Sequence, residues 1–255
     1  MNALIFDCDG VLADTERYGH LPAFNQNFRE FGLPVQWSEE EYGIKLKIAG
    51  GKERMASLLT PEFVAKAGLP TEPEAQKQMI ADWHKRKSEI YKQMIREGRL
   101  PGRPGVARIV KEARAAGWKL AVASTSAEES VRGVLEYVVD KDIAGEFLVL
   151  AGDIVPKKKP APDIYLLTLE RLGMPADQCL VVEDSANGLL AALAAGLRCI
   201  VTLSSYTWEE DMTGALLVVS DLGEPDAPMQ MVANHSKANP GQYIILKDLE
   251  ACLHI

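Results

Sequence analysis

The 255-residue sequence has few cysteines, no excess of positive charge and no long apolar run. The net charge of −8 argues against a nucleic-acid partner, because binding along a phosphate backbone needs a basic face. Since no stretch is long and apolar enough to span a bilayer, we expect no membrane partner either. The spacing of the four cysteines fits neither a disulfide framework nor a zinc site, so we expect reduced, buried thiols at Cys8, Cys179, Cys199 and Cys252.

Two carboxylates stand at the end of the first apolar run. Residues 3–6 are apolar, and Asp7, Asp9 and Gly10 follow, which predicts a buried strand that leads into a turn. In open α/β sheets the ligand crevice lies at the carboxyl ends of the strands, so we expect both carboxylates there. Carboxylates this close repel each other unless a cation lies between them, and Mg2+ prefers oxygen ligands of this kind. The alternative is an ordinary Asp-x-Asp-Gly turn.

The order of the predicted elements indicates an insertion after the first strand. Apolar spacing and capping signals, such as Ser38 with Glu41 and Thr60 with Pro61, predict an all-helical stretch. Its helices are expected at about 16–32, 52–59, 61–67 and 73–96. A segment rich in glycine and proline, 98–105, then breaks the helical pattern.

Helices and strands alternate from there onward. The helices are predicted at 105–116, 127–138, 161–172 and 186–195, and the strands at 118–124, 146–150, 179–183 and 197–202. We therefore predict an α/β fold, a doubly wound, Rossmann-like parallel-sheet core with an inserted all-helical cap domain. The core takes residues 1–15 and 100–255, and the cap takes 16–99. In the tail, short strands are expected at 216–219 and 243–246, with a loop insertion at 223–242.

Hydroxyl groups and a lysine follow later strands of the predicted core. Ser124 and Thr125 end strand 118–124 and are suited to hold phosphate oxygens, although both residue types are also common helix N-caps. Lys159 precedes a helix, where an ammonium group could neutralise both a phosphate and Asp7. The alternative for this lysine is a solvated basic loop.

A second acidic pair, Glu183 and Asp184, ends strand 179–183. Its carboxylates would lie at the same edge of the sheet as the first pair and could complete a divalent-cation site. The alternative is that Asp184 or Ser185 caps the helix that follows. Each of these motifs alone is modest support, but their common position at strand ends favours one phosphate-handling site.

Together these motifs resemble those of the haloacid dehalogenase superfamily of phosphotransferases. The matching pieces are Asp7-Cys8-Asp9-Gly10-Val11, Ser124, Lys159-Pro160-Ala161-Pro162-Asp163 and Glu183-Asp184-Ser185. The resemblance implies that Asp7 is the nucleophile that accepts the phosphoryl group, and that Asp9 is the general acid and then the general base. It also implies Mg2+ as the cofactor, held by Asp7, the Asp9 backbone carbonyl, Glu183 and Asp184. Ser124, Thr125 and Lys159 would hold the phosphoryl group.

Cap residues are similar to those of the CbbY-type phosphatases of photosynthetic organisms, which remove phosphate from xylulose-1,5-bisphosphate, an inhibitor of Rubisco. The similarity lies in Asp14-Thr15-Glu16, in the segment that starts at His20 and in Gly50-Gly51-Lys52-Glu53-Arg54. It implies substrate contacts by Glu16, His20, Gly51, Lys52 and Arg54. Lys52 and Arg54 open a predicted helix and could hold a second phosphate, or they could form a solvated helix start.

Two other functions remain open on the sequence. The chain could be a β-phosphoglucomutase-like mutase or a phosphatase of another small sugar phosphate, although related mutases have a histidine where this chain has Gly19. A phosphosugar-binding regulator without activity is the third alternative, and the complete acidic and lysine set argues against it. We expect a monomer that binds a small-molecule sugar phosphate. The resemblance implies the chloroplast stroma, as a mature form without a transit peptide, for a plant or algal protein and the cytoplasm otherwise.

Overall fold

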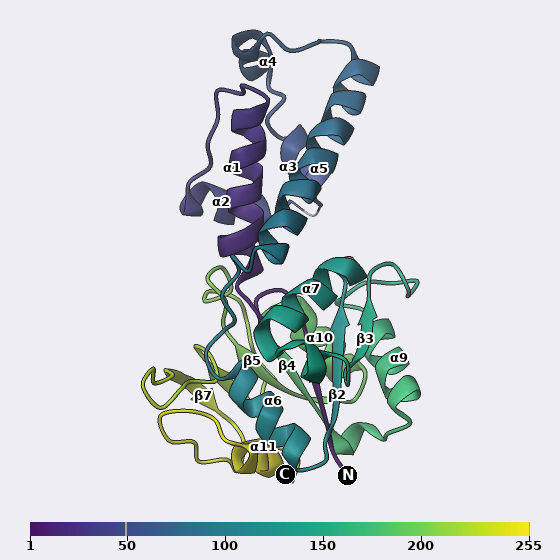
Figure 1. Ribbon diagram of the computed structural model, residues 1–255, viewed down its shortest axis with the longest axis vertical. Coiled ribbons are helices and arrows are strands. Elements are labelled where there is room, and N and C mark those ends of the chain that lie inside the picture. The colour runs from purple at the N-terminus through teal and green to yellow at the C-terminus, as the bar shows by residue number, and fades with distance from the viewer. Residues whose placement is uncertain (49, 255) are drawn as a thin grey trace. The chain divides into compact units, whose positions relative to one another are not determined.

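The computed structural model describes residues 1–48 and 50–254 (Figure 1). The chain divides into two compact units. One unit, here called the core unit, combines Met1–Thr15 with the chain from Leu100 onward, and the other, the helical unit, is Glu16–Arg99.

The core unit is built on a seven-stranded sheet with the strand order β3-β2-β1-β4-β5-β6-β7. All neighbouring strands are parallel except β6 and β7. The strands are β1 (Ala3–Phe6), β2 (Lys119–Ser124), β3 (Leu148–Ala151), β4 (Cys179–Glu183), β5 (Arg198–Thr202), β6 (Leu217–Val219) and β7 (Met231–Asn234). The predicted doubly wound α/β fold is therefore confirmed. The chain leaves β1 toward β2 on one side and later returns to β4 on the other side, which makes the end of β1 the topological switch point.

Helices cover both faces of this sheet (Figure 1). Their bounds are α6 (Val106–Ala115), α7 (Glu128–Val139), α8 (Lys141–Ala144), α9 (Asp163–Leu172), α10 (Ala186–Ala194) and α11 (Leu246–Cys252), with a short 3-10 turn at Ala176–Gln178. Ala3 and Ile5 of β1 pack in one apolar cluster with Ile164 of α9 and Leu189 of α10. Successive strand residues point to opposite faces, so the buried Leu4 and Phe6 lie on the side of α6 and α11. All four cysteines are free and buried, as expected.

Two expectations for the tail were wrong. Tyr243–Leu246 was predicted to be a strand, but Ile244 makes a single backbone bond to Leu222 and the chain then enters α11. The predicted loop 223–242 contains β7, an antiparallel edge strand that pairs only with β6. Its Met231 and Val232 are exposed, so this strand lacks the buried apolar alternation that sequence analysis depends on. The short helix α8 was also not predicted.

The helical unit consists of five helices among its described residues, preceded by a π-helical turn. The turn is Glu16–His20, and the helices are α1 (Leu21–Glu30), α2 (Glu39–Leu46), α3 (Gly51–Ala56), α4 (Pro61–Ala67) and α5 (Pro73–Arg96). Ser38 and Glu41 form the predicted capping box of α2, and Thr60 caps α4. The unit's core is aromatic, with buried rings at Phe24, Phe28, Trp37, Tyr42 and Trp83. None of the described helices of the protein is both long and apolar enough to cross a membrane.

The π-helical turn bears on the position of His20. A π-turn holds one more residue than an α-helical turn, and such turns are frequent at functional sites. The turn Glu16–His20 ends directly before α1 begins, so His20 is its last residue.

Candidate active site

The candidate site lies at the carboxyl ends of three neighbouring strands of the core unit. Strand β1 ends immediately before Asp7, β2 ends at Ser124, and β4 ends at Glu183. These strands are adjacent in the order β2-β1-β4, and the Asp7 amide continues the ladder by donating to the Val182 carbonyl over 3.0 Å. The topology thus brings together residues that are more than 170 positions apart, at the switch point where ligands bind in such sheets.

Lys159 connects the two acidic pairs. Its ammonium group donates to Asp7 Oδ1 at 2.7 Å, to Glu183 Oε1 at 2.6 Å and to the Ala123 carbonyl at 2.9 Å. All three ammonium hydrogens therefore have acceptors. Burial lowers the pKa of this lysine, but the carboxylates of Asp7 and Glu183 outweigh burial and raise it overall. Lys159 is a buried, permanent cation beside Asp7 and not part of a solvated loop.

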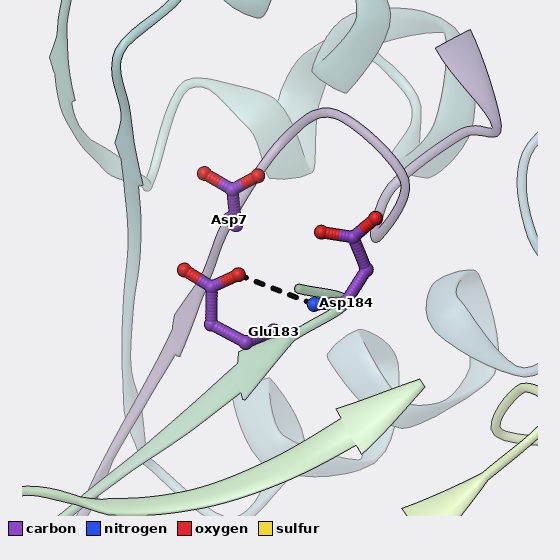
Figure 2. A group of neighbouring side chains, drawn as sticks. All are labelled: Asp7, Glu183 and Asp184. Atoms are coloured by element: carbon purple, nitrogen blue, oxygen red, sulfur yellow. Dashed lines mark hydrogen bonds between the residues drawn. The ribbon is translucent and has the colours of Figure 1, made fainter. Parts of the chain in front are cut away.

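Three carboxylates form an acidic cluster that fits a divalent cation (Figure 2). One oxygen from each of Asp7, Glu183 and Asp184 lies within 4.8 Å of the others. Glu183 Oε2 also accepts the Asp184 backbone amide at 3.2 Å, the dashed line in Figure 2. All three side chains are buried, and hard oxygen ligands in this number suit Mg2+.

The raised pKa values of two carboxyl groups in this cluster also favour a divalent cation there. Burial, with further repulsion from Glu183 and Asp9, raises the pKa of Asp7 to about 7, although Lys159 opposes the shift. Burial, Glu183 and Asp7 likewise raise the pKa of Asp184 well above its usual value. Clustered, buried carboxylates resist ionisation unless a positive charge joins them. A divalent cation would supply that charge and restore the ionised forms.

Asp9 accepts hydrogen bonds at both of its carboxylate oxygens. Thr15 Oγ1 donates to Oδ1 at 2.6 Å, and Ser126 Oγ donates to Oδ2. Ser124 is buried at the end of β2, where its hydroxyl accepts the Ser126 amide at 3.2 Å, and Thr125 lies between these two residues. Sequence analysis noted the serine-threonine run but did not connect Ser126 with Asp9, because that contact depends on the packing of β2 beside β1.

Tyr165 is a site residue that sequence analysis missed. Its hydroxyl donates to Glu183 Oε1 at 2.5 Å, and the Lys159 ammonium lies 4.9 Å from the centre of its ring. The ring is fully buried on α9. The sequence shows only an apolar helix face there, so no local signal distinguishes this tyrosine from a core residue.

In the helical unit, Glu16 and Arg54 share one aromatic partner. The Tyr42 hydroxyl donates to Glu16 Oε2 at 2.5 Å and accepts from Arg54 Nη1 at 3.2 Å. Arg54 Nε also donates to the Ile48 carbonyl at 3.0 Å. These bonds fix the guanidinium, so Arg54 is not part of a freely solvated helix start.

The remaining predicted residues of this unit lie near additional cations. The buried Lys87 ammonium is 2.8 Å from His20 Nδ1, and burial together with Lys87 and Arg54 lowers the pKa of His20 well below its usual value. A Cβ atom at Gly51 would lie 2.8 Å from His84 Nε2, so a side chain there would displace the histidine ring. Burial first, and then the charges of Lys87 and Lys52, lower the pKa of His84. Lys52 itself is exposed.

Sequence analysis did not single out Lys87 or His84. Both lie on α5, in a segment that reads as a helix with an apolar stripe. Their proximity to His20 and Gly51 depends on how α5 packs against the first turn and against α3.

The chain is similar in sequence to several known proteins. A sequence profile described as haloacid dehalogenase-like hydrolase matches residues 1–196. A CBBY-like protein of Arabidopsis thaliana is 46% identical over 228 residues, which are 88% of this chain and 70% of that protein. A phosphorylated carbohydrates phosphatase of Thermotoga maritima is 34% identical over 201 residues, which are 78% of this chain and 84% of that protein.

A solved structure extends the similarity to the fold. It is the crystal structure of a CbbY mutant from Rhodobacter sphaeroides in complex with xylulose-1,5-bisphosphate. The TM-score is 0.71 at 38% sequence identity, and the match covers 87% of this chain and 94% of that chain.

Proposed function

The chain belongs to the haloacid dehalogenase-like hydrolase family and is a phosphatase, and on this basis we propose that it hydrolyses a sugar bisphosphate with the help of Mg2+. The preferred substrate in this proposal is xylulose-1,5-bisphosphate, the compound bound to the Rhodobacter sphaeroides relative. The observation that carries the proposal is the contact of Lys159 with both acidic pairs, next to a carboxylate cluster suited to a divalent cation. A protein that only bound phosphosugars would not need a nucleophile and an acid in addition to these cations.

The proposed first step is transfer of the phosphoryl group to Asp7. A carboxylate oxygen of Asp7 forms a bond to phosphorus while the bond from phosphorus to the sugar oxygen breaks. Asp9 gives its proton to the departing sugar oxygen, and the hydroxyls of Thr15 and Ser126 hold this carboxyl group in place. Lys159 is positioned to stabilise the negative charge of the transferring group.

The proposed second step is hydrolysis of the aspartyl phosphate. A water molecule attacks phosphorus, Asp9 accepts its proton, and the bond to Asp7 breaks to release inorganic phosphate. Mg2+ bound by Asp7, the Asp9 carbonyl, Asp184 and Glu183 would neutralise charge on the phosphate oxygens. Ser124 is the last residue of β2 and Thr125 follows it, and their hydroxyl and amide groups would orient those oxygens.

We propose that the helical unit supplies the site for the second, non-reacting phosphate. Lys52 and Arg54, with Lys87 and His84 on α5, give this unit a concentration of cationic and imidazole groups. Arg54 is already held by Tyr42, so a guanidinium is oriented before a ligand binds. Gly51 permits the close approach of His84. The role of Glu16 and His20 in this proposal is to hold these cations and to contact the sugar.

The similarity to the Arabidopsis thaliana protein also leads us to propose the plastid stroma as the site of action. Isolation of plastids from the source organism, followed by detection of the protein in the soluble and membrane fractions, tests this. Recovery outside plastids would contradict it.

Detection of the phosphoryl group on Asp7 tests the proposed reaction. Acid quenching during turnover, followed by peptide mass spectrometry, should find one additional phosphoryl group on the peptide that contains Asp7. The same samples should contain inorganic phosphate as the product. An isomerised monophosphate without phosphate release would instead identify the mutase alternative.

A further inference from the structure

Arg103 holds a buried position at the carboxyl end of the sheet. Its guanidinium donates to four backbone carbonyls: those of Thr202 at 3.0 Å and Leu203 at 2.7 Å, and those of Gly10 and Ser220. These carbonyls follow β1, β5 and β6, so one side chain connects three strand ends. No salt bridge of Arg103 is found among the described residues. Burial lowers the pKa of its guanidinium, and the nearby Asp14, Asp184 and Asp221 oppose that shift only in part.

The backbone of Arg103 strengthens this connection to the first motif. Its amide donates to the Leu12 carbonyl at 2.9 Å, and the preceding residue, Gly102, forms an isolated bridge with Ala13. Side chain and backbone together therefore hold the loop 8–13, which carries Asp9. The Gly10 carbonyl belongs to the peptide group directly after the one that contains the Asp9 carbonyl. Because Arg103 fixes the Gly10 carbonyl, it also restrains the backbone next to the Asp9 carbonyl.

Two of the segments that Arg103 holds lie against Asp184. A Cβ atom at Gly10 would lie only 2.0 Å from Asp184 Oδ2 and 3.1 Å from Ser204 Cβ, so Gly10, Asp184 and Ser204 are in close contact. Ser204 directly follows Leu203, whose carbonyl Arg103 binds.

We propose that Arg103 is a positioning residue for the divalent-cation site, which holds Asp184 and the Asp9 carbonyl in place through Gly10 and Ser204. The inference rests on the proposed metal at Asp7, Glu183 and Asp184. Partners that orient metal ligands from behind typically change metal affinity by about 10- to 100-fold when they are altered. Lysine keeps the charge at position 103 but has three donors on one atom and cannot reproduce the planar fork that binds four carbonyls.

The test uses metal binding to the free protein, so it needs no substrate. Mn2+ is titrated into metal-free protein, free Mn2+ is measured by electron paramagnetic resonance, and Mg2+ is added as a competitor. Arg108→Lys is the matched control, because Arg108 also binds backbone carbonyls, those of Leu222, Gly223 and Ile244, but away from the acidic cluster. Arg103→Lys should weaken Mn2+ binding about tenfold, while Arg108→Lys should leave it nearly unchanged.

Several outcomes would overturn the inference. Equal Mn2+ affinity in Arg103→Lys and the unaltered protein would do so, as would equal weakening in both arginine variants, which indicates general destabilisation. If Arg103→Lys does not fold, Ser204→Ala removes the hydroxyl group beside Asp184, which also contacts Thr207 Oγ1, and unchanged Mn2+ affinity in that variant would contradict the inference. If the unaltered protein has no Mn2+ site that Asp184→Asn abolishes, the proposed metal site itself fails.

Discussion

The side-chain nitrogen of Lys159 lies 2.7 Å from a carboxylate oxygen of Asp7. Their side chains are only 10% and 12% exposed, so their attraction is screened far less than it would be at the surface. The contact places a permanent positive charge next to the proposed nucleophile, at the point where negative charge would gather during phosphoryl transfer.

Replacement of Lys159 by Met should abolish most of the activity. The variant keeps the length of the side chain but loses the charge, and loss of one such donor should lower kcat by at least about 100-fold. Lys158→Met is the control, because Lys158 is exposed and pairs with the exposed Asp153. Steady-state phosphate release checks the difference, and similar activity in the two variants would contradict a role for Lys159.

Asp7→Asn should remove turnover, because an amide cannot accept a phosphoryl group in this reaction. The same variant should affect the pH dependence of stability. Burial raises the pKa of Asp7 from 3.8 in a free carboxyl to about 7, so the folded protein holds a proton that the unfolded chain releases. Stability from this group is present below pH 3.8 and is lost as the pH rises through 7.

Metal-free Asp7→Asn should therefore unfold at a higher temperature than the unaltered protein at pH 8, with a smaller difference at low pH. Addition of Mg2+ should stabilise the unaltered protein more than the variant, because the cation offsets carboxylate repulsion only where the carboxylate is present. Thermal unfolding monitored by circular dichroism measures both effects. A variant that is less stable at pH 8 without metal would show that ionised Asp7 does not destabilise the fold.

Tyr165→Phe should show how much the hydroxyl of this residue contributes to stability, separately from its ring. The ring under Lys159 remains, but Glu183 Oε1 loses a 2.5 Å hydrogen bond in a buried site. Glu183 Oε1 keeps its contact with Lys159, so the free energy of unfolding should fall by about 1.5–3 kcal/mol, the usual loss for one hydrogen bond to a charged group. Urea unfolding measures the loss, with Tyr137→Phe as the control, since Tyr137 is exposed. Equal stability of both variants would mean that the hydroxyl contributes nothing.

Lys52→Ala should change the KM for a substrate with two phosphates but not for a substrate with one. Loss of a charged hydrogen bond to the second phosphate should raise the KM for a sugar bisphosphate by about tenfold and leave the KM for the monophosphate unchanged. Lys66→Ala, at an exposed lysine on α4 of the same unit, is the control. An equal rise for both substrates would remove Lys52 from the second-phosphate site.

The fold was predictable because its signals are local and repeated. The apolar run before Asp7 and the later alternation of strands and helices predict the parallel sheet, whereas the order β2-β1-β4 comes from the structure. The expected site of Asp7, Lys159 and Glu183 rested on a different rule, that ligands bind at the carboxyl ends of parallel strands, and the structure supplies the contacts among them. Strand β7 was not predicted, because it is a short edge strand whose residues are mostly exposed and do not alternate between buried and exposed positions.

Residues that support the site were not predictable, because their roles arise from packing between distant segments. Tyr165 looks like a core residue of α9, and Arg103 lies in a segment rich in glycine and proline that reads as a linker. Their partners, Glu183 for the tyrosine and the carbonyls of four residues for the arginine, are 18 to 117 positions away. Every residue has a backbone carbonyl, so the sequence does not indicate which carbonyls Arg103 binds. Only the folded structure identifies them.

Release of inorganic phosphate from xylulose-1,5-bisphosphate, with and without Mg2+ and beside β-glucose 1-phosphate, tests the proposed function most directly. The arrangement of Asp7, Lys159 and the acidic cluster predicts fast release from the bisphosphate that depends on Mg2+, and weak release from the monophosphate. Equal release from the bisphosphate with and without Mg2+, or conversion of the monophosphate to an isomer without phosphate release, would contradict the account.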